Sequence, residues 1–116
     1  MNIEQIREYC LSKKMVTEGF PFNEDTLVFK VAGKMFALLS LEQKRINLKC
    51  DPQRAIDLRE HHEFILPGYH MNKQQWNTVI FEAGIDGAFL KELIDHSYDL
   101  IVAGLPKKIQ AELSSD

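Results

Sequence analysis

The segment from residue 67 to residue 76 concentrates side chains that could bind a ligand. It places Tyr69, His70, Lys73 and Trp76 within ten residues. The two aromatic rings could stack on a base or another ring, and the histidine and lysine could hold an anion. We interpret these four residues as a candidate ligand-binding loop. In the alternative interpretation Trp76 is a core aromatic residue, Tyr69 closes the loop and His70 hydrogen-bonds to a carbonyl group.

The same segment carries the signals of a loop followed by the start of a helix. Pro67 and Gly68 are typical of a turn. Asn72 and Gln75 have the spacing of a capping box, which predicts one helical turn before Trp76. Backbone N–H groups at such a helix start suit an anion, so a small anionic ligand is among the expected partners.

Basic side chains gather in the middle of the chain. Residues 27–79 hold eight basic and five acidic residues, a formal charge of +3, whereas the whole chain has −3. A basic sheet face or wing could follow the phosphates of a nucleic acid. The alternative is a solvated sheet whose lysines discourage edge-to-edge pairing. The candidate nucleic-acid-binding residues are Lys30, Lys34, Arg45, Lys49 and Lys73.

The other reactive side chains do not form a recognisable catalytic or metal-binding set. His61 and His62 are adjacent, so their side chains diverge, and neither has a partner at a metal-ligand spacing. Asp95, His96 and Ser97 are consecutive in a predicted helix, where neighbours point about 100° apart and cannot form a relay. The sequence has no phosphate-binding glycine loop, zinc-protease motif or nucleophile elbow. We expect no enzyme activity, metal or cofactor.

Helices are predicted in three places. Asn2 and Gln5 form a capping box before a helix over about residues 2–13. A second helix covers about residues 52–61, and a third, capped by Asp86, covers about residues 87–104. We expect residues 106–116 to be a frayed polar tail. The second helix is expected to bury Ala55, Ile56 and Leu58, and the third Leu90, Leu93, Ile94, Ser97, Leu100 and Ile101.

Strands are predicted between these helices. Thr26–Val31 and Lys34–Ser40 are rich in β-forming residues, and Ala32 and Gly33 suit a two-residue turn between them. Two further strands are expected over residues 45–50 and 76–81. The hairpin turn implies three facing pairs: Phe29 with Phe36 and Leu27 with Leu38 on the core side, and Lys30 with Met35 on the outer side. The strand over residues 45–50 alternates, with Ile46, Leu48 and Cys50 facing inward and Arg45, Asn47 and Lys49 facing outward.

The order of these elements predicts an α+β domain, with an antiparallel sheet and helices on one of its faces. A chain of 116 residues with 45% hydrophobic and 27% charged residues is expected to form one domain without disulfides. Cys10 and Cys50 are interpreted as reduced thiols that lie in the core or are half-buried. The sequence shows no signal peptide and no apolar run long enough for a membrane span. We therefore expect a cytoplasmic protein, without a membrane partner, that is monomeric.

Several ordered segments resemble the MmcQ/YjbR family of small bacterial proteins. They are EDTLVFKVAGKMFA at residues 24–37, NLKCDP at 47–52, PGYHMNK at 67–73, WNTV at 76–79 and LIDHSYDL at 93–100. The resemblance covers nearly the whole chain. It implies a CyaY-like (frataxin-like) fold, with a curved antiparallel sheet packed against helices in a double-wing arrangement, and a DNA-binding function. Iron binding by an acidic first helix, as in frataxins, is not carried over because Arg7, Lys13 and Lys14 offset Glu4 and Glu8.

Two hypotheses of different classes follow. The first is a cytosolic DNA-binding protein, whose phosphate-led and largely sequence-independent binding uses the basic strand wings and the loop from Tyr69 to Lys73. The second is a small-ligand or protein-interaction domain whose site is the loop from Pro67 to Trp76. An enzyme ranks third, since no nucleophile–base pair can be named.

Overall fold

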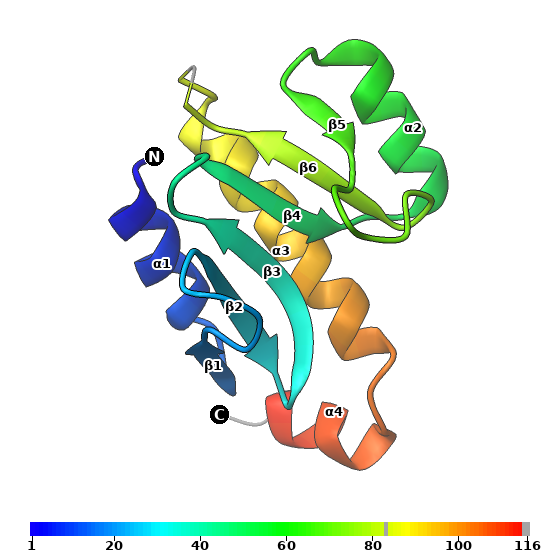
Figure 1. Ribbon diagram of the computed structural model, residues 1–116. Coiled ribbons are helices and arrows are strands. Elements are labelled where there is room, and N and C mark those ends of the chain that lie inside the picture. The colour runs from blue at the N-terminus through cyan, green and yellow to red at the C-terminus, as the bar shows by residue number, and fades with distance from the viewer. Residues whose placement is uncertain (83, 115–116) are drawn as a thin grey trace.

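Six strands form one antiparallel sheet in the computed structural model, which describes residues 1–82 and 84–114 (Figure 1). The spatial order is β1-β2-β3-β4-β6-β5. The strands are β1 (Val16–Gly19), β2 (Thr26–Val31), β3 (Lys34–Ser40), β4 (Arg45–Lys49), β5 (Ile65–Pro67) and β6 (Trp76–Ile80). The helices are α1 (Ile3–Leu11), α2 (Pro52–His61), α3 (Gly87–Ala103) and α4 (Lys107–Ser114). The predicted α+β class and antiparallel sheet are confirmed.

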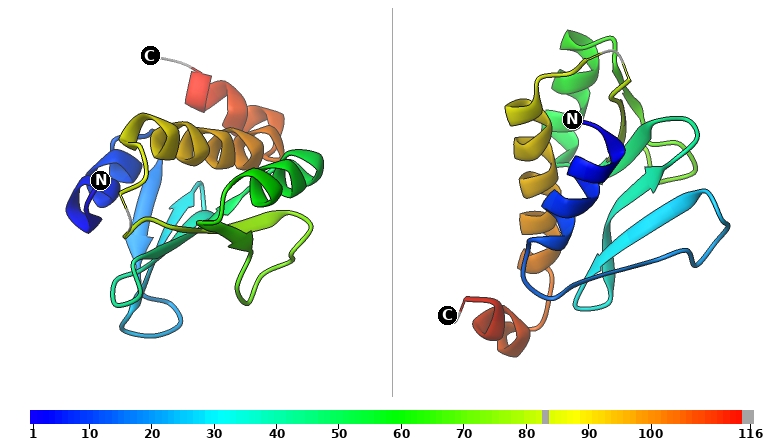
Figure 2. Two further views of the ribbon diagram at one scale, coloured as in Figure 1. Left: turned by 90° about the horizontal axis from the view of Figure 1, so that it is seen from above. Right: turned by 90° about the vertical axis from the view of Figure 1, so that its left-hand side faces the viewer.

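The helices of the described residues lie on one side of the sheet (Figure 2). α3 packs across β2, β3 and β4, while α2 packs on β5 and β6 and α1 on β1. The opposite side, called the open face from here on, carries two projecting loops over residues 20–25 and 68–75 (Figure 2). No helix within residues 1–82 and 84–114 is long and apolar enough to cross a membrane.

Polar caps start the helices where the sequence predicts them. The Asn2 side chain accepts from the Gln5 backbone at 2.8 Å, and the Gln5 side chain accepts from the Asn2 backbone at 2.9 Å. The Asp51 and Asp86 carboxylates cap α2 and α3 by accepting from the backbone N–H groups of Arg54 and Phe89. Each cap binds backbone N–H groups that the first helical turn leaves without a partner. The boundaries of α2 agree with the prediction, and α3 ends one residue earlier.

The core lies between α3 and the sheet. Leu90, Leu93 and Ile94 form the buried stripe of α3 together with Ser97, as predicted, and they pack against Phe29. Leu100 and Ile101 are half-buried rather than fully enclosed. On α2, Ala55 is buried and Leu58 packs against the core from a half-buried position. Ile56 was predicted to be buried but is 42% exposed, because it lies on the side of α2 that faces solvent.

The β2–β3 hairpin starts in the predicted register and then shifts by one residue. Ala32 and Gly33 both have positive φ angles, as a two-residue hairpin turn requires. Lys30 faces Met35 as expected. Beyond a bulge, Phe29 faces Ala37 instead of Phe36.

This bulge changes which side chains reach the core. The extra residue lets both Phe36 and Ala37 join the core cluster. Leu27 consequently faces Leu39, and Leu38 faces Val28 on the open face. The predicted pairs of Phe29 with Phe36 and of Leu27 with Leu38 were therefore wrong, because the alternation was extended past an irregularity.

Three further segments differ from the predictions. The edge strands β1 and β5 were not predicted, since each has only three or four residues and no clear alternation. The residues after Asn72 form a turn and not a helical turn; the Asn72 side chain accepts from the Gln74 N–H at 2.9 Å. The segment from residue 107 to 114 forms α4 instead of a frayed tail, with Leu113 packed against the core. Residues 115 and 116 lie outside the described residues.

Candidate functional site

A pocket of about 550 Å³ opens on the open face between the loops over residues 20–25 and 68–75. Its apolar floor includes Met35, Leu38 and Met71. Its polar lining comes from both loops and from the strands between them, and comprises Asn23, Asp25, Thr26, Ser40, Gln43, Arg45, Asn47, Tyr69, His70 and Thr78. We call it the open-face pocket.

Strand register brings these side chains together. Leu38 on β3 faces Asn47 on β4, and Asn47 faces Thr78 on β6. In the neighbouring row Ser40 faces Arg45. Side chains of facing residues point to the same side of a sheet, so both rows line the open face.

Asn47 and Thr78 fasten one wall of the pocket. The Thr78 hydroxyl donates to Asn47 Oδ1 at 2.5 Å and accepts from the Tyr69 N–H at 2.9 Å. The Asn47 amide in turn donates to the Tyr69 carbonyl oxygen at 3.1 Å. Both backbone groups of Tyr69 are thus hydrogen-bonded to the sheet. The loop over residues 68–75 therefore has a fixed position over β4 and β6.

An aromatic pair forms the rim above this network. The ring centroids of Tyr69 and His70 lie 4.0 Å apart. Tyr69 is 57% exposed, and His70 has a φ of 59°. A non-glycine residue in the left-handed region costs about 1 kcal/mol, so the hydrogen bonds of Tyr69 hold a strained loop in place.

The opposite wall is fastened by Asp25 and Asn23. The two carboxylate oxygens of Asp25 accept from the Ser40 hydroxyl and the Glu42 N–H, each at 2.7 Å. Asn23 Oδ1 accepts from the backbone N–H groups of Asp25 and Thr26. The loop over residues 20–25 is thereby joined to the turn after β3, and hydrogen bonds within the chain hold both pocket walls.

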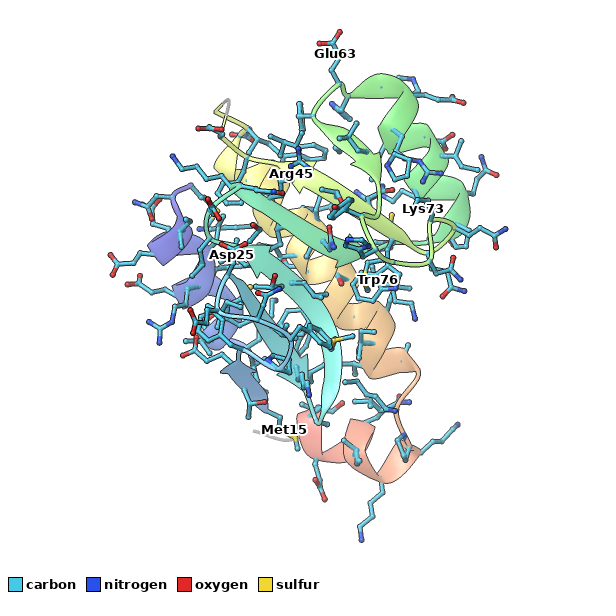
Figure 3. All side chains as sticks on the ribbon, in the orientation of Figure 1. Met15, Asp25, Arg45, Glu63, Lys73 and Trp76 are labelled. Atoms are coloured by element: carbon cyan, nitrogen blue, oxygen red, sulfur yellow. The ribbon has the colours of Figure 1, made fainter. Side chains whose placement is uncertain are left out.

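Arg45 supplies the positive charge of the pocket. In the described part of the chain its guanidinium has no ion pair and no hydrogen bond. Asp25 contributes negative charge to the lining, but both of its oxygens already accept hydrogen bonds. Figure 3 shows Arg45 near the start of β4 and Asp25 on the neighbouring loop. The pocket lining thus contains the unpaired guanidinium of Arg45 and the carboxylate of Asp25, whose hydrogen bonds hold the loop.

The structure brings together some of the predicted site residues. Arg45 was predicted as a phosphate contact, and Tyr69 and His70 as ligand contacts; all three line the open-face pocket. Asn47 was recognised only as an outward-facing strand residue, and Thr78 was not singled out. Alternation of polar residues on β4 was the available signal for Asn47, but its bond to Thr78 depends on pairing between distant strands.

Trp76 and Lys73 do not line this pocket. Trp76 is 8% exposed and packs with Val28 and Leu38, as the core-aromatic alternative expects. Gly68 lies directly against it, since a Cβ atom added to Gly68 would come within 2.8 Å of the Trp76 Cβ atom. Lys73 Nζ donates to the Gly68 carbonyl oxygen at 3.2 Å. Figure 3 shows both residues toward the far end of β4 from Arg45.

The remaining basic candidates divide between the two faces. Lys30 faces Met35, which lines the pocket floor, and Lys49 follows at the end of β4. Both extend the open face beyond the pocket. Lys34 faces the core residue Val31 at the end of the hairpin, so it lies on the other side of the sheet. The predicted basic surface therefore loses Lys34.

Residues that resemble a catalytic triad in sequence serve as structural links. The Ser97 hydroxyl donates to the Phe36 carbonyl oxygen at 2.6 Å and accepts from the Lys49 N–H at 2.9 Å. It thus bridges β3 and β4 one residue beyond their paired residues Ala37 and Leu48. His96 Nε2 accepts from the Asp51 N–H at 3.2 Å, and burial lowers the pKa of His96.

The cysteines are free thiols in apolar surroundings. Cys10 and Cys50 are both buried. Burial raises the pKa of Cys10 to about 12 and that of Cys50 to about 11. Thiols with such pKa values are poor nucleophiles near neutral pH. Within residues 1–82 and 84–114, no group of three or more histidine, cysteine, aspartate or glutamate residues is arranged to hold a metal ion.

Comparison with known proteins places this chain in a family. The YjbR family model matches residues 11–100. YbdF of Escherichia coli O157:H7 is 39% identical over 110 residues, which are 92% of this chain and 89% of YbdF. YjbR of Escherichia coli K12 is 28% identical over 110 residues, covering 93% of both chains. The crystal structure of Deinococcus radiodurans DR2400, a DUF419 domain, has a TM-score of 0.89 at 37% identity and covers 99% of this chain and 89% of its own. The crystal structure of a Pseudomonas syringae protein has a TM-score of 0.75 at 29% identity, and the match covers 86% of this chain and 98% of that protein. The chain therefore belongs to the YjbR family.

Proposed function

We propose that this protein is a binding domain for a small molecule, and that the open-face pocket is its site. The observation that carries the proposal is the unpaired Arg45 in a pocket whose two walls are already fastened. Small-molecule sites combine an apolar lining with a few placed polar groups, as this pocket does. Walls that are ordered before binding reduce the entropy that binding costs.

Binding without catalysis fits the reactive groups of the chain. Cys10 and Cys50 are buried, and burial raises the pKa of both thiols. Ser97 and His96 are engaged in hydrogen bonds between α3 and the strand segments. None of these four residues lines the open-face pocket.

A pocket-filling variant tests the proposal. Ligand-observed NMR would screen a mixture of amino acids, nucleotides, sugars and aromatic or aliphatic carboxylates against the protein. Met35→Trp places a large ring on the pocket floor and is expected to abolish binding of every hit. Ile56→Trp adds the same ring on exposed α2 and serves as the matched control. Hits that bind the folded Met35→Trp variant normally would contradict the proposal.

DNA binding is a second candidate, favoured by the basic residues of the open face. Lys30 and Lys49 form no ion pair within the described part of the chain, and they extend the face on which Arg45 lies. The two projecting loops suit a double-wing arrangement on a CyaY-like sheet (Figure 2). Three phosphate contacts would reduce affinity by about 2.7 decades per decade of salt. Lys30→Glu combined with Lys49→Glu should abolish binding of a short DNA duplex, while unchanged affinity would exclude this candidate.

We further propose that the protein is a cytoplasmic monomer. Two free, buried thiols are typical of a reducing compartment. Light scattering after size-exclusion chromatography measures the oligomeric state directly, and fractionation of cells measures the location.

A further inference from the structure

We infer that the ligand of the open-face pocket is a small planar aromatic anion, whose anionic group pairs with Arg45 and whose ring lies against Tyr69. The inference rests on the proposed function and names the chemistry that this site selects. Carboxylates and phosphates attached to an aromatic ring share this chemistry. A guanidinium binds either group through two parallel hydrogen bonds.

The arginines of the chain show that Arg45 is left available for such an anion. Arg7 pairs with Glu18 at 2.5 Å, and Arg54 pairs with Glu92. Arg59 donates to the Lys73 carbonyl oxygen at 2.8 Å. Arg45 alone of the four has no partner in the described part of the chain, although it lines a pocket of about 550 Å³.

The negative group of the lining restricts where the anion can lie. Asp25 repels an anion, so the anionic group belongs on the side of Arg45 that faces away from the loop over residues 20–25. That direction leads along β4 toward Asn47, two residues farther on the same face. The spacing of alternate strand residues separates their Cα atoms by about 7 Å. Asn47 holds the backbone of Tyr69, and Arg45, Asn47 and Tyr69 all line the same pocket.

The aromatic wall is suited to a planar ring. Tyr69 is exposed and paired with His70 at 4.0 Å between ring centroids. Aromatic rings attract one another in offset or edge-to-face contact. Met35 and Met71 contribute flexible thioethers to the lining, and such groups pack well against aromatic rings. A flat ring with one charge therefore matches both the wall and the floor.

A matched set of probes tests the charge and the ring separately. Isothermal titration would compare 2-naphthoate and AMP, which are planar anions, with adenosine and 2-naphthylmethanol, which are neutral. Cyclohexanecarboxylate and inorganic phosphate supply the anion without a planar aromatic ring. At least one of 2-naphthoate and AMP should bind at least tenfold more tightly than both its neutral counterpart and its counterpart without an aromatic ring. Which of the two binds distinguishes a carboxylate ligand from a phosphate ligand.

Variants assign the two halves of the ligand to their residues. Arg45→Gln should weaken the bound planar anion about tenfold to a hundredfold, since a hydrogen bond to a charged group is lost. It should leave the affinity of a neutral ring unchanged. Tyr69→Leu should lower the affinity of all aromatic probes, charged and neutral, by the same factor. Lys49→Gln removes a charge from the same face outside the pocket and should leave the affinity unchanged.

The possible failures are distinguishable. The inference would be overturned if no planar anion bound up to millimolar concentration, or if neutral and anionic rings bound with equal affinity. The proposed function would still stand in that case if other molecules bound and Met35→Trp blocked their binding. An affinity of the planar anion that Arg45→Gln leaves unchanged would also overturn it. Binding confined to a DNA duplex and lost in Lys30→Glu with Lys49→Glu would overturn the inference and the proposed function together.

Discussion

The two faces of the sheet differ in how they use charged residues. On the helix-covered side, Lys13 pairs with Asp95 at 2.6 Å and Arg54 pairs with Glu92. On the open face, Lys30, Arg45 and Lys49 have no such partners among residues 1–82 and 84–114. The two ion pairs connect α3 to the segment after α1 and to α2, whereas the unpaired side chains of the open face are available to a ligand. The comparison therefore separates residues that maintain the fold from residues that serve binding.

Lys13 shows how completely the helix side engages a charge. Its Nζ atom lies 5.1 Å from the ring centroid of Tyr9 and 5.0 Å from that of Tyr98. The Tyr9 hydroxyl donates to Asp95 at 2.6 Å. Burial, followed by this hydrogen bond, raises the pKa of Tyr9 to about 12. These contacts connect α1 to α3.

Phenylalanine truncations give the largest expected contrast between the faces. Phe36→Ala removes a fully buried ring from the core and should lower the free energy of unfolding by about 4 kcal/mol. Phe22→Ala removes a ring that is 63% exposed on the open face and should change it by less than about 0.5 kcal/mol. Urea denaturation of both variants measures the difference. Similar losses would show that the open-face loop is part of the folded core.

The bridge at Ser97 comes next in size. Ser97→Ala leaves the Phe36 carbonyl and the Lys49 N–H without their buried partner, which should cost about 2 kcal/mol. Hydrogen exchange at the Lys49 amide should accelerate as well. The exposed Ser114→Ala is the control. If exchange at Lys49 stays unchanged, the hydroxyl does not bridge the strands.

The Lys13–Asp95 pair should contribute less. Asp95→Asn is expected to lower the free energy of unfolding by about 1 kcal/mol, because the pair is only partly buried. The loss should shrink in concentrated salt. Asp99→Asn on the exposed side of α3 is the matched control. A loss as large at high salt would point to packing rather than charge.

His96 gives a pH dependence of still smaller size. Burial lowers its pKa from the ordinary value of 6.5, so the unfolded chain binds the proton more readily than the folded chain. The stabilisation by neutral His96 is full above pH 6.5 and is lost as the pH falls below that value. Denaturation midpoints between pH 7.5 and 5 should fall less steeply in His96→Gln than in the wild type. Parallel curves would assign the fall to other groups.

Neutralising the open face should have the smallest effect on stability. Arg45→Gln and Lys49→Gln remove unpaired charges, so each should change the free energy of unfolding by less than about 0.5 kcal/mol. The reason is that neither substitution leaves a charged partner without its ion pair among the described residues. Thermal denaturation checks this. A loss above 1 kcal/mol in Arg45→Gln would place that residue among the structural groups and remove the contrast between the faces.

Local signals accounted for much of the fold. Asn2, Asp51 and Asp86 cap helices as predicted, because a cap involves residues only three positions apart. The alternation of β4 also appears in the structure, with Ile46 and Leu48 buried. The β3 bulge was missed because periodicity alone does not reveal an extra residue in one strand.

The candidate site was only partly accessible to sequence reasoning. Tyr69 and His70 were found through their local concentration in a loop, and Arg45 through its outward position on a strand. Their meeting in one pocket depends on β6 pairing with β4, across residues far apart in the chain. The type of Trp76 suits both a core and a stacking site, and its burial against Val28, Leu38 and Gly68 was not visible in the sequence.

The sequence by itself determined the helix starts, the hairpin turn, the α+β class and the outward direction of Arg45. Each follows from contacts between near neighbours or from the period of two along a strand. Tertiary structure alone decided that Arg45 stays unpaired in the described part of the chain, that Asn47 and Thr78 hold Tyr69, and that Ser97 bridges β3 and β4. The physical reason is that these outcomes depend on which distant groups come within about 3 Å of one another, and local patterns do not encode that distance.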